Sequence, residues 1–419
     1  MNREVIQPWG TLTGIRPVKR VVQMKQKGME DGEIRQILSG RFGVSEEKIN
    51  LAIAIADREI LVFPRPPQDS CSLYLDVPFC PSKCIYCSFA SMGVDQMKQF
   101  VRPYLDALQT EIAATAEIVR VLGFRVDSVY IGGGTPTTLS EQELDELLAA
   151  ITDRFDLSHI KEFTVEAGRP DTITAPKLAA MRRWGVDRIS VNPQSMNQKT
   201  LDAIGRRHTP EQTAAAMELA GGFGFRAINM DVIAGLPEET PEEFAASLAQ
   251  VAAFRPENIT VHTMCIKRAA RLTTEEDPVD LSPDAAVQEM VRFAHKRLHE
   301  EGYYPYYLYR QKKTLGNQEN TGFCREGYEG YYNVYMMEEL QTVVSMGVGG
   351  VTKLVKQTGR AAAAEGSGSA QGGTADQTDN VRIERIFNIK DVREYIRRLD
   401  ELIERKQYLY EFFDRERSV

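Results

Sequence analysis

The sequence of 419 residues contains no apolar run that approaches the roughly 18 residues of a membrane-spanning helix. Its first ten residues, MNREVIQPWG, contain no hydrophobic segment of the kind found in signal peptides. Positive charge is not in excess either, because the formal net charge is −8, and this argues against a general nucleic-acid-binding protein. We therefore expect a cytoplasmic protein without a membrane span, in which thiols stay reduced.

Cysteine is scarce, yet three of the six cysteines form a C-x3-C-x2-C motif in DVPFCPSKCIYCSF: Cys80, Cys84 and Cys87. A structural zinc site would need a fourth ligand, but Cys71 lies upstream and no histidine is closer in sequence than His159. A metal-free group of buried thiols is another alternative. A [4Fe-4S] cluster is normally held by four thiolates. Three ligands therefore indicate a cluster with one iron open to a cofactor or substrate.

The chain divides into three regions. Residues 1–65 are predicted to form a small helical domain, with helices in DGEIRQILSGRF and SEEKINLAIAIADREI and with Ser45 as an N-cap. The proline-rich FPRPPQDS ends this domain. Residues 301–419 are expected to form an α-rich region that covers the substrate. It ends in one amphipathic helix, IKDVREYIRRLDELIERKQYLYEFF, and contains a disordered insertion at about 359–380.

Between these regions, residues 70–300 alternate short apolar strands with amphipathic helices. The predicted strands are SLYLDV, VDSVYI, EFTVEA, DRISVN, AINMDVI and NITVHTM. Helix starts are marked by capping pairs at Ser140 with Glu143, Thr209 with Gln212, and Thr240 with Glu243. Six β-α repeats predict an α/β fold with a parallel sheet, a partial (β/α)6 barrel of the TIM type. Chemistry is then expected at the carboxyl ends of the strands.

The cysteine motif, with Tyr86 before its last cysteine and a strand before the motif, resembles the radical S-adenosylmethionine (SAM) superfamily. In that superfamily SAM binds the open iron and is cleaved reductively to a 5′-deoxyadenosyl radical. Five segments follow one another as in the oxygen-independent coproporphyrinogen III oxidase family, over about residues 72–350: SLYLDVPFCPSKCIYC, GGGTPT, VEAGRPD, RISVNPQSMNQKTLDAIGRRH and MDVIAGLPEET. The segments NPQSM and TVHTMCIKRAARL, together with GIRPVK near the start, are most similar to those of the HemZ-type coproporphyrinogen dehydrogenases.

The resemblance implies a role for particular residues. The three motif cysteines would hold the [4Fe-4S] cluster, and one or two SAM molecules would bind beside it. The residues implied to contact SAM are Tyr74, Gly133, Gly134, Thr135, Glu166, Gln194, Arg206 and Asp231. Acidic and amide side chains suit ribose hydroxyls and an ammonium, and a guanidinium suits a carboxylate. Taken singly, each could instead be an ordinary polar residue at a strand end. The GGG run alone could be a plain tight turn; beside the cysteines it would let SAM approach bare backbone.

The reaction implied by the resemblance is oxidative decarboxylation of two coproporphyrinogen III propionates to vinyl groups, which gives protoporphyrinogen IX for haem biosynthesis. A low-potential electron donor such as flavodoxin or ferredoxin would be needed. Because this tetrapyrrole carries carboxylates, cations are expected around it. The candidates are Lys267, Arg268 and Arg271 in IKRAAR and Arg310 in YRQKK, and both runs could instead be solvated charged faces. Cys71, Cys265 and Cys324 are not expected to be ligands.

Two departures from the family pattern leave alternatives open. The best-known oxidases carry a further cysteine where this chain has Phe89, and the related haem chaperones also lack it. Those chaperones carry a His-Asn pair, whereas here Tyr332 precedes Asn333, and the absent histidine argues against haem transfer. We therefore favour the oxidase over a haem chaperone. A radical SAM enzyme that modifies another tetrapyrrole, for example by methylation, is the third alternative.

Overall fold

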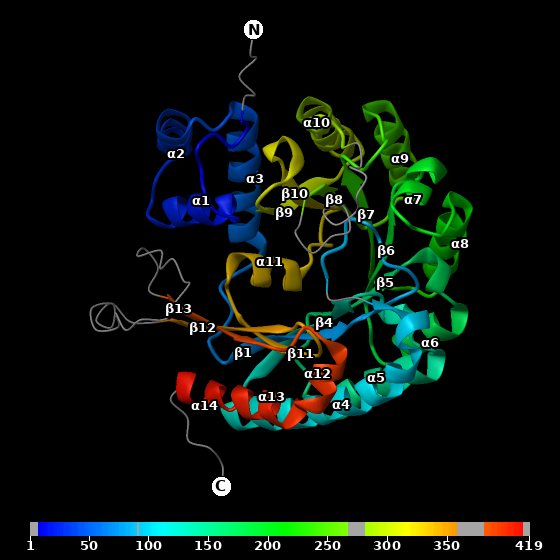
Figure 1. Ribbon diagram of the computed structural model, residues 1–419. Helices are drawn as coiled ribbons and strands as arrows, with labels where there is room; N and C mark the ends of the chain where they lie inside the picture. Colours follow the sequence, from blue (N-terminus) through cyan, green and yellow to red (C-terminus); the bar gives the residue numbers. More distant parts are fainter. Residues whose placement is uncertain (1–6, 90–91, 267–280, 358–380, 414–419) are drawn as a thin grey trace.

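The computed structural model describes residues 7–89, 92–266, 281–357 and 381–413, and its centre is a curved sheet of eleven strands (Figure 1). The order across the sheet is β13-β12-β11-β1-β4-β5-β6-β7-β8-β10-β9. Six of these strands follow one another in chain order and are parallel. They are β1 (Ser70–Val77), β4 (Arg125–Gly133), β5 (Glu162–Gly168), β6 (Arg188–Gln194), β7 (Ala227–Ala234) and β8 (Asn258–Thr263). The predicted partial (β/α)6 barrel is therefore confirmed.

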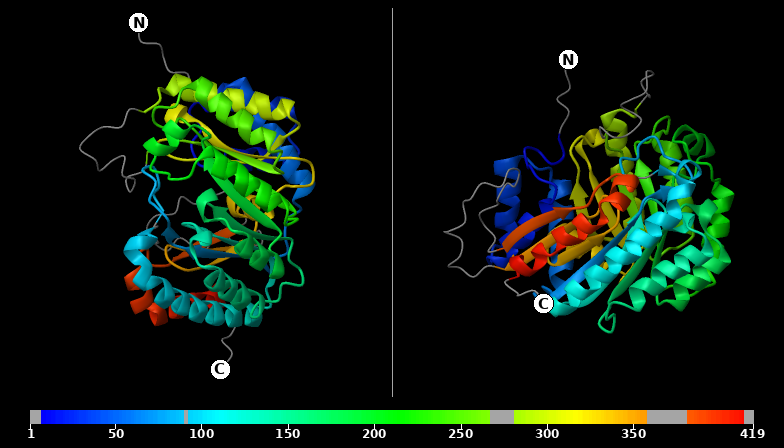
Figure 2. Two further views of the ribbon diagram at one scale, coloured as in Figure 1. Left: turned by 90° about the vertical axis from the view of Figure 1, so that its right-hand side faces the viewer. Right: turned by 60° about the horizontal axis from the view of Figure 1, so that its bottom comes forward.

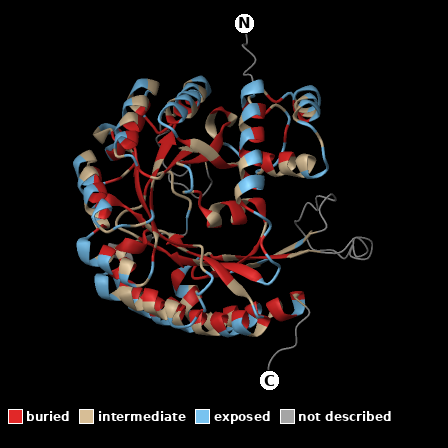
Figure 3. Cartoon of the chain, turned by 180° about the vertical axis from the view of Figure 1, so that it is seen from behind, coloured by how far each residue is buried: buried red, intermediate tan, exposed pale blue. Residues whose placement is uncertain are grey.

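Helices cover the outer face of this sheet, as the two further views show (Figure 2). They are α4 (Val94–Leu122), α5 (Glu141–Thr152), α6 (Ala175–Arg183), α7 (Gln198–Ala203), α8 (Pro210–Gly221), α9 (Pro241–Ala253) and α10 (Asp284–Glu300). The three predicted capping boxes are present at the starts of α5, α8 and α9. The strands of the barrel are mostly buried, and the helices are buried mainly on the sides that face them (Figure 3). No helix in the described ranges is both long and apolar enough to cross a membrane.

The C-terminal region differs from the prediction, because it is not α-rich. It adds β9 (Tyr304–Arg310), β10 (Glu319–Cys324), β11 (Thr342–Met346), β12 (Val351–Gln357) and β13 (Val381–Phe387) to the sheet. β11 pairs in parallel with β1, whereas β10 pairs antiparallel with β8, so these strands extend the barrel at both ends. The predicted insertion at 359–380 lies outside the described residues.

The predicted C-terminal helix is also wrong in detail, because it is three short helices: α12 (Val392–Arg397), α13 (Leu399–Lys406) and α14 (Tyr408–Phe412). They pack against α4. The buried carboxylate of Glu111 on α4 accepts hydrogen bonds from groups in and near these helices. Lys406 Nζ lies 2.6 Å from Glu111, and Asn388 Nδ2 and the Gly347 amide donate to it at 2.8 and 2.7 Å. One buried charge with these donors fixes the C-terminal helices on the barrel.

The N-terminal helices are α1 (Pro17–Gln26), α2 (Asp31–Gln36) and α3 (Glu46–Val62), and Ser45 caps α3 as predicted. α1 and α3 contact β9, and Leu308 of β9 belongs to the same buried cluster as Trp9 and Ile49. The Arg310 amide donates to the Ile15 carbonyl at 2.8 Å. The N-terminal unit is therefore packed along the β9 edge of the sheet.

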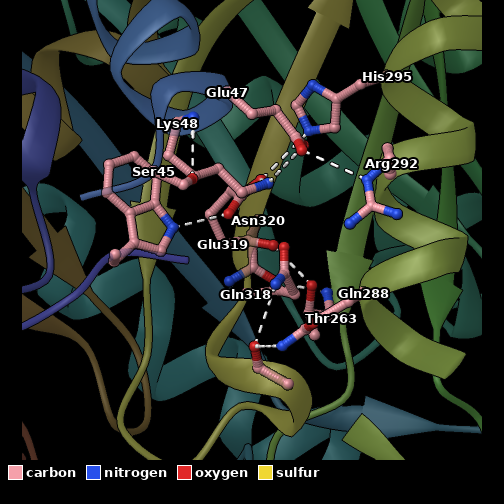
Figure 4. A network of polar contacts seen from close by, with 12 residues as sticks. Ser45, Glu47, Lys48, Thr263, Gln288, Arg292, His295, Gln318, Glu319 and Asn320 are labelled. Atoms are coloured by element: carbon pink, nitrogen blue, oxygen red, sulfur yellow. Dashed lines mark hydrogen bonds and ion pairs between the residues drawn. The ribbon is translucent and has the colours of Figure 1, made fainter. Parts of the chain in front are cut away.

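A buried polar network joins this unit to β10 (Figure 4). Glu319 accepts from Lys48 Nζ at 2.7 Å and from Trp9 Nε1 at 2.8 Å, and His295 Nε2 lies 3.3 Å away. Burial alone would raise the pKa of Glu319, but Lys48 and His295 hold it well below its usual value. The carboxylate is thus ionised inside the protein and ties α3, α10 and β10 together.

Candidate active site

A cavity of about 610 Å³ lies inside the barrel, where strands β1 and β4–β8 end. All three motif cysteines line it, together with polar side chains from these strands and aromatic side chains from β9 and α11 (Tyr331–Glu338). In such a sheet the strand ends and the following loops meet at one place. The sequence-based expectation that the cysteine and glycine loops lie together therefore agrees with the structure.

The cysteine loop follows β1 directly. Its first cysteine belongs to β2 (Phe79–Cys80), a short strand that pairs with β3 (Met92–Gly93). The Cys87 amide donates to the Cys84 carbonyl at 3.1 Å, which makes a tight turn between these two cysteines. Thr135 Oγ1 lies 3.5 Å from Cys80 Sγ, so the glycine loop contacts the motif.

Three thiols on one cavity wall provide the ligand chemistry of an iron–sulfur cluster. In the parts of the chain that are described, no three His, Cys, Asp or Glu side chains are already arranged around a common point as metal ligands. The three motif cysteines nevertheless line the same cavity. The set of donors fits the cluster, and the cavity beside it provides the room for a ligand of the open iron.

The glycine loop packs closely against neighbouring segments. A Cβ at Gly133 would lie 2.6 Å from the Asp76 carboxyl. Gly133 also has φ +102°, which favours glycine. At Gly134 a Cβ would lie 2.6 Å from the Phe79 carbonyl. These glycines are needed so that the loop can pack against β1 and the cysteine segment, and both also line the cavity.

Unpartnered polar atoms gather on β6. Ser190, Asn192 and Gln194 alternate along the strand and line the cavity, and Ser190 Oγ, Asn192 Oδ1 and Gln194 Oε1 have no hydrogen-bond partner. Arg206 Nε is likewise unpartnered, while its Nη1 donates to the Asn192 carbonyl. Gln194 has a left-handed φ of 68°, an uncommon conformation for this residue type. Buried polar atoms without partners are costly, so this wall fits a polar ligand such as SAM.

Two carboxyl groups in the cavity differ in protonation. Burial raises the pKa of Glu166 to about 7, although Tyr130 donates a hydrogen bond to it. Burial also acts to raise the pKa of Asp231, but His262 and Asn229 lower it below its usual value. Near neutral pH the cavity therefore holds one ionised carboxylate, Asp231, and one that is close to its titration point.

Three tyrosines form a stack on the cavity wall. The ring centroids of Tyr130 and Tyr332 are 4.5 Å apart, and Tyr74 lies 6.2 Å from each of them. Tyr74 also donates to Asp76 at 3.2 Å. The residue at the position of the chaperones' histidine, Tyr332, is thus part of an aromatic wall.

The predicted substrate cations are not brought to the cavity by the described structure. Lys267, Arg268 and Arg271 lie outside the described residues. Arg310 does not line the cavity: Nη1 donates to the Leu12 carbonyl at 2.7 Å, Nη2 donates to Asn317 at 2.6 Å, and the guanidinium stacks over Trp9. Alternation along β9 explains this, because Tyr307 and Tyr309 face the cavity and the residues between and after them face the N-terminal helices.

Sequence reasoning missed His262, Tyr309 and Asn192, which line the cavity. Each has a signal in the sequence that could have been used. His262 lies two positions after Thr260 on β8, and Asn192 two positions before Gln194 on β6, so strand alternation puts each pair on one face. Tyr309 follows from the same rule once β9 is known to be a strand.

Comparisons with known proteins identify the family of this chain. Residues 74–251 match the model of the radical SAM superfamily. The chain is 37% identical over 415 residues to the oxygen-independent coproporphyrinogen-III oxidase-like protein HemZ of Bacillus subtilis, covering 98% of this chain and 79% of that protein. It is 31% identical over 266 residues to the heme chaperone HemW of Escherichia coli, covering 63% of this chain and 65% of that protein.

Among solved structures, coproporphyrinogen III oxidase (HemN) from Escherichia coli, described as a radical SAM enzyme, has a TM-score of 0.61 at 22% identity. The match covers 83% of this chain and 72% of that one, and it shows a common fold. The protein is thus a member of the radical SAM superfamily, whose cofactors are a [4Fe-4S] cluster and SAM. Within that superfamily it belongs to the family of the HemZ oxidase-like protein.

Proposed function

We propose that this protein is a radical SAM oxidoreductase that decarboxylates coproporphyrinogen III propionates to vinyl groups, giving protoporphyrinogen IX. The observation that supports this most directly is the cavity itself, in which the cysteine wall and an aromatic wall of tyrosines face one common space. The similarity to the HemZ oxidase-like protein over 98% of the chain supports the same reaction class.

The proposed roles follow the geometry of the cavity. Cys80, Cys84 and Cys87 would hold the cluster, which supplies reductive cleavage of SAM when bound. Arg206 would pair with the SAM carboxylate, and Gln194 would turn its unpartnered oxygen toward SAM's donors. Other contacts proposed for SAM are those of Tyr74, Gly133, Gly134, Thr135, Glu166 and Asp231. At each propionate one hydrogen atom is removed, CO2 leaves, and one electron passes to an acceptor. The chain's part is to orient the substrate and exclude water.

Substrate carboxylates need cations, and Lys353 is our candidate among the described residues. It lines the cavity from β12, and its Nζ donates to the Met336 carbonyl at 2.8 Å. Burial, with the nearby Arg16, lowers its pKa to about 7. A bound carboxylate would favour its charged form. The two arginines on the wall have other roles, because Arg169 pairs with Asp171 and Arg206 is proposed to bind the SAM carboxylate.

The test is an anaerobic assay of the reconstituted protein with SAM, a low-potential reductant and coproporphyrinogen III. We expect products with one and two fewer carboxyl groups, resolved by mass, and deoxyadenosine and CO2 formed in step. SAM cleavage that the porphyrinogen does not stimulate, together with no decarboxylated product, would refute the proposal.

The haem chaperone is the second candidate, supported by the 31% identity to HemW. The tyrosine at position 332 disfavours it, and so does His262, whose two ring nitrogens already face Tyr309 and Asp231. Stoichiometric haem binding and transfer to an acceptor protein, without decarboxylation, would decide for the chaperone.

A further inference from the structure

A chain of polar contacts joins side chains from three strands of the cavity wall. Tyr309 Oη on β9 lies 3.4 Å from His262 Nδ1 on β8, and His262 Nε2 lies 3.5 Å from Asp231 Oδ2 on β7. On the other side, Thr260 Oγ1 donates to Asn229 Oδ1 at 2.9 Å, and Asn229 Nδ2 donates to Asp231 Oδ1 at 2.7 Å. All five residues line the cavity.

The hydrogen bonds in this series of contacts can all be donated toward Asp231. With the proton on Nε2, His262 donates to the carboxylate, and its Nδ1 is then free to accept from the Tyr309 hydroxyl. Asn229 donates to the other oxygen of Asp231. Both contacts therefore end at this carboxylate, and each oxygen keeps a lone pair for a further donor.

The surroundings of Asp231 make these donors necessary. The Asp231 side chain is 16% exposed on the cavity wall, and the other titratable groups that face it are Glu166, Tyr130, Tyr307, Tyr309 and His262. These described neighbours include no lysine or arginine, so without His262 the carboxylate would keep only neutral donors such as Asn229, beside the phenols and a second carboxyl. Glu166, which lacks such an imidazole contact at hydrogen-bond distance, has its pKa raised to about 7 by burial.

We propose that His262, backed by Tyr309, is a positioning residue that keeps Asp231 ionised and aimed at the paired hydroxyl groups of a nucleoside ligand, which here is the ribose of SAM. The inference rests on the SAM-binding part of the proposed function and not on the identity of the tetrapyrrole. If so, β9, a strand of the C-terminal region, contributes to SAM binding through Tyr309.

The test compares His262→Phe, which removes the donor, with His262→Gln, which keeps an amide N–H near the position of Nε2. SAM affinity is measured by equilibrium dialysis of the anaerobically reconstituted protein without reductant, between about pH 6 and about pH 8.5. In the wild type Asp231 stays ionised over this range, whereas Glu166 titrates near pH 7, so each variant is compared with the wild type at the same pH. In His262→Phe the pKa of Asp231 should rise, and the affinity relative to the wild type should fall as the pH falls, by about tenfold or more at the acid end. His262→Gln should restore the wild-type profile.

Tyr309→Phe is the second variant and removes one hydroxyl without removing the imidazole. It should shift the SAM profile in the same direction by a smaller amount. A wild-type profile in His262→Phe would overturn the inference. If that variant loses its iron or its circular-dichroism signal, a wild-type profile in Tyr309→Phe would overturn it. Because no tetrapyrrole is present, absent decarboxylation would refute the proposed function and leave this result standing.

Discussion

Loss of the Lys48 charge should release the N-terminal helices from the barrel. In Lys48→Met the apolar stem is kept, but Glu319 loses the cation 2.7 Å away, and both side chains are almost fully buried, at 3% and 0% exposure. Removing one partner of a buried ion pair costs about 3–5 kcal/mol, because the other charge stays in a poorly solvating environment. Trp9 and His295 still contact Glu319, so we expect the lower value, about 3 kcal/mol.

Amide hydrogen exchange is the suitable assay, since a chain with several packed units need not unfold in one step. Protection of the amides in α3 should fall by about a hundredfold, while protection in α9 should not change. Lys296→Met on α10 is the matched control: this lysine is 77% exposed, and its loss should change the free energy of opening by less than about 0.5 kcal/mol. Adding Glu319→Gln to Lys48→Met should restore much of the protection. Exchange in α3 of Lys48→Met within a fewfold of the wild type would refute the role given to this network.

Three further outcomes are expected. Alanine at Cys80, Cys84 or Cys87 should abolish the iron and sulfide content after anaerobic reconstitution, whereas Cys71→Ala or Cys324→Ala should leave it unchanged; zinc in place of iron would contradict this. Gly134→Ala should lower the cluster content as well as the SAM affinity, because its Cβ would push on the Phe79 carbonyl, and a variant with a full cluster would show that the loop can yield. Glu166→Gln should stabilise the SAM-free protein at pH 8 by about 3 kcal/mol, and by less than about 1 kcal/mol at pH 5. The sign follows from the raised pKa of Glu166, about 7: its stabilisation is complete below the ordinary carboxyl pKa and is lost as the pH rises through 7. Equal thermal shifts at both pH values would contradict it.

The barrel could be predicted from the sequence because its signals are local. Each strand is an apolar run buried on both faces, and each helix start carries its own cap, as at Ser140 and Thr240. The cysteine spacing is equally local. What could not be predicted depends on partners far apart in the chain, such as β11, which pairs with β1 across more than half of the sequence. β9 was not predicted as a strand, because its sequence is rich in tyrosine and basic residues. The face of the strand on which Arg310 lies could therefore not be predicted either.

The site could be predicted as a set of residues but not as an electrostatic arrangement. Glu166 and Asp231 have the same chemistry in the sequence, and only their neighbours separate them. The partner that separates them, His262, is far from both motifs in the chain, so spacing gives no indication of the contact. Similarly, the close approach of Gly133 to Asp76 could not be predicted from the sequence.

The open sheet has two edges, and the chain protects them by different means. At one edge, β9 is covered by α1 and α3, and the Arg310 amide is satisfied by the Ile15 carbonyl. At the other, β13 carries exposed Arg382 and Arg385, and charged edge residues oppose pairing with a second chain. Truncation of the N-terminal helices would therefore leave a tyrosine-rich strand with unpaired backbone groups in water, a template for intermolecular aggregation.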